Sequence, residues 1–241
     1  MLYRADFLYD CADFYSLQSD PAVKLHGVLM RQIAPKQAEA LHRSQYHPFS
    51  LYCRPTVQKS LIARLSVLAE ETVGLLDSLE AQKSLTLYGL EQTVHLVSVK
   101  KEAPCTLQEA AERIRGELVE LSFLTPASYR KDGRDLTPPS PEGYFTSVVR
   151  KLREFEGIDI LQSEFQAAWQ ACVPISYRLE LARHRITGYE KKGMVGEMVL
   201  RLPRNAEQAE LMRTVLAYAE YSGIGGKTGQ GMGGLLVRSC G

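Results

Sequence analysis

The chain has 241 residues, 45% of them hydrophobic and 24% charged, a composition that predicts one or two globular domains. Its 29 basic and 28 acidic residues give a formal net charge of +1, so bulk charge does not indicate a nucleic-acid partner. Five scattered cysteines without a CxxC pair argue against a disulfide framework. No apolar run could span a membrane, and no signal-peptide pattern opens the chain. We therefore expect a cytoplasmic protein without a membrane partner.

The first half predicts the order strand, helix, strand, strand, helix, strand. Asp20-Pro21 is typical of a helix start, and the apolar residues after it recur at helical spacing. Pro35 ends this helix and can begin a second short one, which Pro48 closes. Alternating apolar residues indicate half-buried strands. The predicted strands are 3–9, 49–53, 61–69 and 85–101, and the main helices are 20–33 and 72–83.

The second half repeats this order. Thr106 and Glu109 form a capping box that opens a short helix ending near Gly116. After it we expect strands at 118–124, 175–185, 195–202 and 235–237, a loop at 125–141, a turn at 188–193, and helices at 142–153, 164–171 and 206–221. Each half is then a βαββαβ unit. The sequence predicts an α+β protein with two tandem ferredoxin-like domains, residues 1–115 and 116–241, and a C-terminal glycine-rich loop.

The most unusual segment holds seven glycines between residues 223 and 234. Such density indicates backbone conformations or close approaches that side chains would block. A Walker A motif is excluded because Tyr221 stands where it needs a glycine, and the GxGxxG match at 229–234 precedes a strand instead of opening a helix. We expect a loop whose N–H groups bind phosphate. A flexible link between the last helix and the last strand is the alternative.

Basic residues gather in the second half, which carries 16 basic and 13 acidic residues from position 126 onward. Short charge runs are usually solvated faces, but several of them in one half favour a surface for a polyanion. We expect His184, which lies among arginines, to contact phosphate. The clusters are Arg130/Lys131/Arg134, Arg150/Lys151/Arg153, Arg178/Arg183/His184/Arg185 and Lys191/Lys192.

Among the five histidines, His42 is the candidate for proton transfer. It falls at the end of the short helix among polar neighbours, where a histidine titrates near neutral pH. A preference for the helix C-terminus explains it equally well. His26 lies beside Leu25 in the apolar helix, which favours packing or a partner contact. No HExxH, metal-spaced histidine pair or Gly-x-Ser-x-Gly elbow is present, and we expect no metal or cofactor.

Four segments resemble the CRISPR-associated endoribonucleases that process precursor CRISPR RNA. The run from Tyr218 through Gly234 resembles their glycine-rich signature, and the stretch from Leu41-His42 to His47-Pro48-Phe49 resembles their histidine segment. Ser122–Arg130 resembles the strand that opens their second domain. Lys192–Glu197 resembles their Gly-aromatic-x-Gly strand, with Met194 in place of the aromatic. The similarity covers nearly the whole chain.

The resemblance implies two ferredoxin-like domains that bind CRISPR repeat RNA and cut it without metal. The ribose 2′-hydroxyl attacks the adjacent phosphate and leaves a 2′,3′-cyclic phosphate and a 5′-hydroxyl, with His42 as general acid or base. The positions at which some members of the family carry additional catalytic residues fall near Gly27 and Pro48, and neither residue can transfer a proton. His26 and His47 lie beside them and can substitute, and Lys36 and Tyr46 are weaker candidates.

Two other functions stay open at this point: a non-cleaving subunit of a CRISPR ribonucleoprotein, and an RRM-type RNA-binding module, which the missing aromatic signature disfavours. Further CRISPR effector subunits and a second copy of the chain also stay open as partners. The candidate catalytic residues are His42, His26 and His47. The candidate RNA-binding residues are Arg130, Lys131, Arg134, Arg150, Arg183, His184, Arg185, Lys191, Lys192, Gly225, Gly226, Lys227, Thr228, Gly229 and Gly231.

Overall fold

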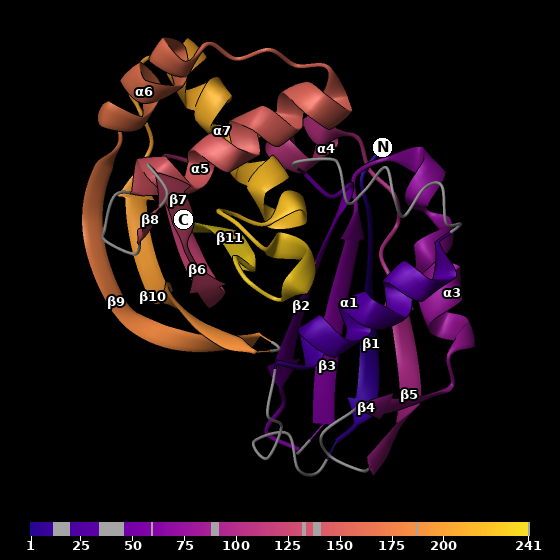
Figure 1. The fold of residues 1–241 in the computed structure, drawn as a ribbon. Coiled ribbons are helices and arrows are strands. Elements are labelled where there is room, and N and C mark those ends of the chain that lie inside the picture. The colour runs from indigo at the N-terminus through magenta and orange to yellow at the C-terminus, as the bar shows by residue number, and fades with distance from the viewer. Residues whose placement is uncertain are drawn as a thin grey trace.

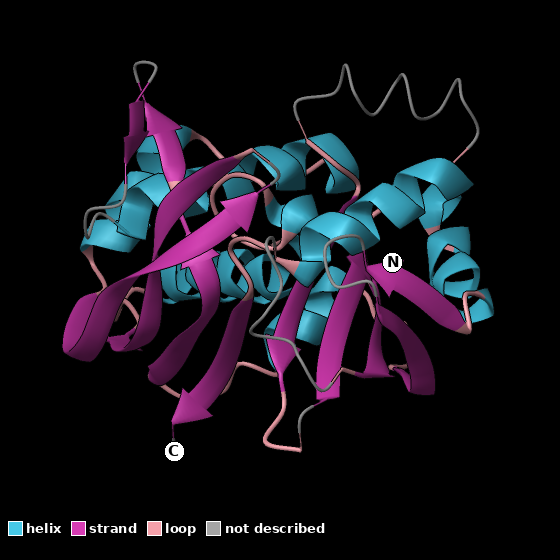
Figure 2. Ribbon diagram, turned by 60° about the horizontal axis from the view of Figure 1, so that its bottom comes forward, coloured by secondary structure: helices cyan, strands magenta, loops and turns pink. Residues whose placement is uncertain are grey.

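The fold is a pair of antiparallel sheets covered by helices. The computed structural model describes residues 1–11, 20–33, 46–58, 60–87, 92–131, 134–136, 141–186 and 188–240. Figure 2 shows the two sheets side by side, with most helices on one side of them. The predicted α+β class with one sheet in each half is confirmed.

The first sheet has five antiparallel strands in the order β2-β3-β1-β5-β4 (Figure 1). Helices α1 and α3 pack on it and bury their apolar faces in its core. In the β1-α1-β2-β3-α3-β5 unit the first and third strands, β1 and β3, are central, with β5 beside β1 and β2 beside β3, which is the ferredoxin-like order. The elements are β1 (Tyr3–Asp10), α1 (Pro21–Gln32), β2 (Phe49–Pro55), β3 (Ser60–Val67), the 3-10 turn η2 (Glu70–Thr72), α3 (Gly74–Ala81), β4 (Ser84–Leu87) and β5 (Gln92–Lys101).

The second sheet repeats that order as β11-β6-β10-β9. Its core is filled by α4, α5, α6 and α7 together with the inward side chains of β6, β10 and β11. The elements are α4 (Leu107–Glu112), β6 (Leu118–Ala127), β7 (Tyr129–Lys131), β8 (Arg134–Leu136), α5 (Pro141–Lys151), the π-helical turn η3 (Leu152–Glu156), α6 (Gln162–Gln170), β9 (Val173–Ile186), β10 (Tyr189–Arg201), α7 (Ala206–Ser222), the 3-10 turn η4 (Thr228–Gln230) and β11 (Leu235–Cys240).

Local signals in the sequence explain where the helices begin. The Asp20 side chain accepts a hydrogen bond from the Ala22 N–H at 2.9 Å and caps α1. Thr106 and Glu109 exchange the two bonds of the predicted capping box, at 3.1 and 2.7 Å. None of the helices in the described part of the chain is long and apolar enough to cross a membrane.

Two predicted connections differ from the structure. The segment predicted as a loop at 125–141 continues β6 to Ala127 and then forms the β7–β8 hairpin. The turn predicted at 188–193 is much tighter, because Gly188 adopts φ +85° and β10 begins at the next residue. Polar composition marked both segments as loops, but long paired strands carry polar residues wherever they extend beyond the core.

Helix α4 joins the second core, although the prediction assigns its residues to the first domain. Leu107, Ala110 and Ala111 are buried there with residues of α7. The domain boundary after residue 115 stays a prediction.

Strand β2 joins the two halves because both of its faces are buried. Leu51 faces the first core, whereas the Ser50 hydroxyl donates to the Tyr221 carbonyl at 2.5 Å, at the end of α7. Arg4 of β1 adds a second link: its guanidinium lies 3.8 Å from the centre of the Tyr221 ring and donates to the Glu220 carbonyl at 2.9 Å. The end of α7 and the glycine loop after it are thus held between the two sheets.

Candidate RNA-binding and cleavage site

The glycine loop, residues 223–234, runs from the end of α7 to β11 and is mostly buried. Within it Gly226 and Lys227 are exposed. Gly225 and Gly233 both have φ +70°, and a Cβ would lie 2.2 Å from the Ser128 carbonyl oxygen at the first and 2.0 Å from the Ile224 carbonyl oxygen at the second. The glycines are therefore needed for close backbone approach, as the sequence predicts.

Many amides of the loop bind the protein itself. The Gly225 N–H donates to the Ser147 hydroxyl at 2.8 Å, and the Gly226 N–H donates to the Ser128 carbonyl at 2.8 Å. Gly233 and Gly234 donate to Pro126 and Thr125 of β6. The amides of 227–229 make no hydrogen bond to the described residues. The predicted binding of phosphate by the loop backbone is thus restricted to this short stretch.

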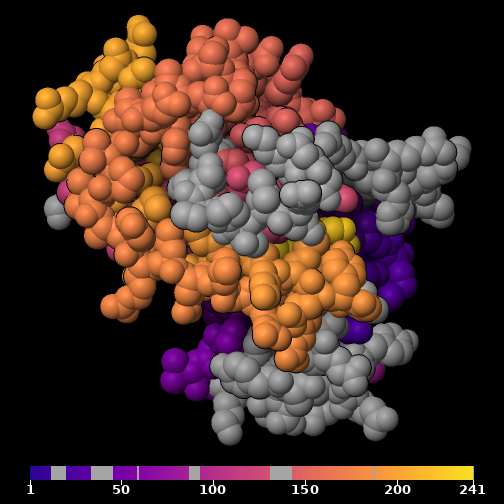
Figure 3. All heavy atoms as spheres, turned by 60° about the vertical axis from the view of Figure 1, so that its left-hand side comes forward, coloured from indigo at the N-terminus to yellow at the C-terminus, as the bar shows by residue number. Residues whose placement is uncertain are grey.

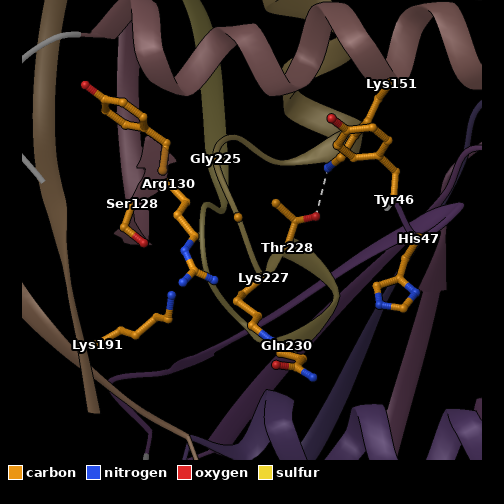
Figure 4. A pocket seen from close by; sticks show the side chains of 12 residues that line it. Tyr46, His47, Ser128, Arg130, Lys151, Lys191, Gly225, Lys227, Thr228 and Gln230 are labelled. Carbon is orange, nitrogen blue, oxygen red and sulfur yellow. Dashed lines mark hydrogen bonds between the residues drawn. The ribbon is translucent and has the colours of Figure 1, made fainter. Parts of the chain in front are cut away.

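A pocket of about 350 Å³ opens beside the exposed tip of the loop (Figure 4). It is bounded by the loop, the start of β7, the end of α5, the first part of β10 and the segment before β2. Its described lining contains several cations and no acidic side chain. The lining residues are Tyr46, His47, Ser128, Tyr129, Arg130, Lys151, Lys191, Gly225, Gly226, Lys227, Thr228 and Gln230.

Three cations converge on the pocket from separate elements. Figure 4 shows the side chains of Arg130 and Lys191 pointing toward each other, from β7 and β10, and the side chain of Lys227 extending from the loop toward Gln230. Lys227 has φ +62° and is the one described residue other than glycine with positive φ. A side chain in this region costs on the order of 1 kcal/mol, a cost often found at functional sites. The arrangement suits a multiply charged anion such as phosphate.

Lys151 adds a buried amine at the back of the pocket. It is 2% exposed, and its Nζ donates to the Ser222 carbonyl at 2.6 Å and the Thr228 hydroxyl at 2.8 Å (Figure 4). Ser222 ends α7, so the amine faces the negative end of the helix dipole. Burial lowers the pKa of Lys151 to about 7. Lys151 therefore links α5 to both ends of the exposed part of the loop.

In the sequence Lys151 belongs to a basic cluster, but it is not among the predicted RNA-binding residues. Helical spacing could have indicated that Lys151 is buried. Tyr144, Val148 and Lys151 follow one another at intervals of four and three residues, and they share the buried face of α5. Arg150, which was selected, is exposed and does not line the pocket.

Two of the three candidate catalytic histidines meet beside the loop. The rings of His26 and His47 are 5.5 Å apart, and His47 stacks on Phe49 at 5.5 Å. A Cβ on Gly229 would lie 3.4 Å from the His47 ring and 3.6 Å from His26 Nδ1, so glycine lets the loop approach both. His47 and Tyr46 line the pocket. His42 and Lys36 lie outside the described residues.

The position of His184 in the structure does not fit the predicted contact with phosphate. It is 1% exposed, with Nε2 2.8 Å from the Gln230 carbonyl and Nδ1 3.4 Å from the Asp20 carboxylate. Near the β9–β10 turn this side chain faces the glycine loop, so it packs the loop against the start of α1. A Cβ on Gly231 would lie 2.8 Å from the same ring.

The remaining candidates are dispersed. Arg183 is exposed and pairs with Glu190 at 3.5 Å, and Arg185 and Lys192 are exposed on the β9–β10 hairpin away from the pocket lining. For Lys131 and Arg134 the structure describes the backbone of β7 and β8. In the described part of the chain, no group of three His, Cys, Asp or Glu side chains could hold a metal ion.

Known proteins resemble this chain in sequence and in fold. A family model for the CRISPR-associated endoribonuclease Cas6 matches residues 121–235. A CRISPR-associated endoribonuclease Cas6 from Streptococcus thermophilus is 23% identical over 224 residues, which span 90% of this chain and 91% of the relative. Another from Mycobacterium tuberculosis is 25% identical over 224 residues, which span 89% and 70%.

A solved Cas6 product complex superimposes with a TM-score of 0.81, at 22% identity and with 99% of both chains covered. At this identity the likeness concerns the fold, and it agrees with the two sheets described above. The matched segment and the two curated relatives, which cover about nine tenths of this chain, make it similar to the Cas6 family of CRISPR-associated endoribonucleases.

Proposed function

We propose that this protein is an endoribonuclease that cuts CRISPR repeat RNA in precursor transcripts to give mature CRISPR RNA. One observation carries the proposal: Arg130, Lys191 and Lys227 converge on a pocket that His47 and Tyr46 also line. Cations would hold the RNA backbone next to groups that can transfer protons. The names of the relatives support the same activity.

The principal catalytic candidate, His42, lies outside the described residues, in the stretch of chain that leads to Tyr46. Tyr46 lines the pocket, and four peptide units separate it from His42, so the two Cα atoms are at most about 14 Å apart. We propose that His42 acts on a phosphate bound by the three cations. Of the candidate residues that could assist His42, His47 and His26 are the ones beside the glycine loop.

The proposed reaction is an internal transesterification. The 2′-hydroxyl loses its proton to a general base while its oxygen bonds to the adjacent phosphorus. The bond from phosphorus to the 5′-oxygen breaks, and a general acid protonates the leaving oxygen. The products are a 2′,3′-cyclic phosphate and a 5′-hydroxyl. The nucleophile is already tethered to the substrate, which supplies much of the advantage of an intramolecular reaction.

We further propose that the protein needs no metal for this step. The three pocket cations can stabilise the charge that develops on the phosphate oxygens, a task that metal ions perform in other nucleases. Lys151 holds the loop that carries Lys227 and acts as a positioning residue.

The test is incubation of the protein with the CRISPR repeat RNA encoded beside its gene, with EDTA present. We expect one cut, with cyclic phosphate and 5′-hydroxyl ends. A single 2′-deoxy substitution just upstream of the cut should abolish cleavage and leave binding intact. Cleavage of the substituted RNA, or a need for magnesium, would refute the mechanism. Binding without any cleavage would favour the non-cleaving subunit instead.

A further inference from the structure

Strand β9 carries an apolar surface that the rest of the described protein leaves uncovered. Four of the ten exposed large hydrophobic residues lie on this one strand. Tyr177 is 71% exposed, Leu181 60%, Val173 48% and Ile175 46%. Figure 3 brings this side of the molecule forward and shows orange atoms of the second half at its surface. Scattered apolar residues are normal on surfaces, but a contiguous row of them indicates an interaction site.

Two residues of the row, Tyr177 and Leu181, continue the core face of the second sheet, whereas a register shift between Val199 and Leu200 places Val173 opposite the exposed Arg201. Tyr177 and Leu181 stand opposite Met198 and Met194 of β10, and both methionines are buried in the core. Paired residues of antiparallel strands point to the same face. The helices therefore cover β10 on this face and leave β9 exposed.

The backbone of β9 is also available for pairing. In the described sheet β9 is an end strand that pairs with β10 alone, over 14 residues (Figure 1). Proteins usually keep edge strands short or interrupt them, because a long regular edge can accept another strand. Its outward side chains Ser176, Arg178 and Glu180 are exposed.

We propose that β9 pairs antiparallel with β9 of a second copy of this chain, about a two-fold axis at Leu179. The register follows from the charges. With the axis at Leu179, Arg178 of each copy lies opposite Glu180 of the other, and Tyr177 lies opposite Leu181. Both pairs occur twice, which is the self-complementarity that a two-fold interface requires.

Other registers lose this match. An axis at residue 178 or 180 places Arg178 or Glu180 opposite its own copy, and like charges directly opposite destabilise a sheet. An axis at 177 or 181 leaves Arg178 opposite Ser176 or His184. A shift by an odd number of residues would place the apolar row against the polar face.

The sheet itself leaves Glu180 without a cation opposite. Its neighbour in β10 is Val195, whereas Arg178 faces Glu197. In the dimer, Arg178 of the second copy would lie opposite Glu180.

Charge reversal tests the register directly. Arg178→Glu and Glu180→Arg each place like charges opposite one another twice, and each should weaken dimerisation roughly tenfold. The combined Arg178→Glu/Glu180→Arg variant exchanges the two charges and should restore the dimer. Sedimentation equilibrium measures all four proteins, and circular dichroism checks that each is folded.

A monomeric wild-type protein at high micromolar concentration would overturn the proposal, as would a double variant that dimerises no better than the single ones. If the strand binds RNA instead, Arg178→Glu should weaken repeat binding in the monomer and Glu180→Arg should strengthen it. Neither outcome bears on cleavage, so this test stands apart from that of the proposed function.

Discussion

The two arms of the glycine loop have similar compositions and different surroundings. The pocket arm, Gly223–Thr228, exposes Gly226 and Lys227 at the pocket that Arg130 and Lys191 also line. The buried arm, Gly231–Gly234, is fully enclosed by residues of both halves, among them Asp20, Tyr52 and His184. One glycine-rich run thus has two kinds of surroundings: one arm exposes a lysine at a pocket, and the other packs between the two sheets.

The largest expected effect concerns a residue in neither arm. If the pocket arm binds the RNA and His42 transfers a proton, His42→Ala should slow single-turnover cleavage by about 10²–10⁴-fold. RNA affinity should stay almost unchanged, because other residues make the phosphate contacts. His95→Ala is the matched control, because His95 lies exposed on β5 and does not line the pocket. Cleavage at the parent rate by His42→Ala would remove this residue from the mechanism.

Lys151 connects the pocket arm to α5, and its ionisation should appear in stability. Folding lowers the pKa of Lys151 from its ordinary 10.5 to about 7. Between these values the unfolded chain binds more protons, so stability rises with pH across this window. The penalty for burying the charge is complete below pH 7 and fades toward pH 10.5.

Lys151→Met removes this titration and nearly preserves the side-chain volume. The free energy of unfolding of the parent minus that of the variant should therefore increase from pH 7 to pH 10, by up to about 4 kcal/mol. Urea denaturation at several pH values measures the difference, and the other titrating groups cancel. A difference that stays flat across this range would mean that Lys151 keeps an ordinary pKa in the fold.

A side chain in the buried arm should destabilise the protein where it blocks the close approach of two backbone segments. Gly233→Ala introduces a Cβ 2.0 Å from the Ile224 carbonyl oxygen at φ +70°, and we expect a loss of about 3 kcal/mol or more in stability. Gly226→Ala is the control from the pocket arm, where the nearest atom is 3.8 Å away and φ needs no glycine. Equal stability of the two variants by denaturation would contradict the assigned difference between the arms.

Much of this arrangement could be predicted from the sequence because its signals are local. The helix cap at Asp20, the capping box at Thr106 and the apolar alternation of the strands all act within a few residues, and they led to the correct order of elements. The β7–β8 hairpin and the division of 85–101 into β4 and β5 were not predicted, and the turn at Gly188 was predicted too long, because polar strand ends resemble loops.

The roles of individual residues depend on distant contacts. His184 and Arg185 are neighbours in the same basic run, yet His184 is buried against Gln230 and Arg185 is exposed. Lys151 looks like one more surface cation until the end of α7 and the loop close over it. In the sequence the two glycine arms differ by Lys227 in one and Met232 in the other, but their burial comes from what β2, β6 and β9 place around them.

A smaller effect is expected at Lys227, where one substitution separates the backbone strain of the pocket arm from its contribution to RNA binding. Lys227→Gly relieves the left-handed backbone, so stability should stay the same or rise by up to about 1 kcal/mol. Repeat RNA should bind several-fold more weakly, with the slope of log affinity against log salt reduced by about 1. Unchanged affinity and slope in a filter-binding titration would show that Lys227 contacts no phosphate.

The most direct measurement compares two sets of three basic residues for binding to a repeat RNA made uncleavable by 2′-deoxy substitution. One protein carries Arg130→Ala, Lys191→Ala and Lys227→Gly in the pocket. The other carries Arg150→Ala, Lys192→Ala and Arg201→Ala, at exposed positions outside the pocket lining. Both lose the same charge. We expect the pocket variant to bind at least about 100-fold more weakly and the control within a few-fold of the parent. Equal losses in the two proteins would mean that diffuse charge holds the RNA, and would contradict the assignment of the site.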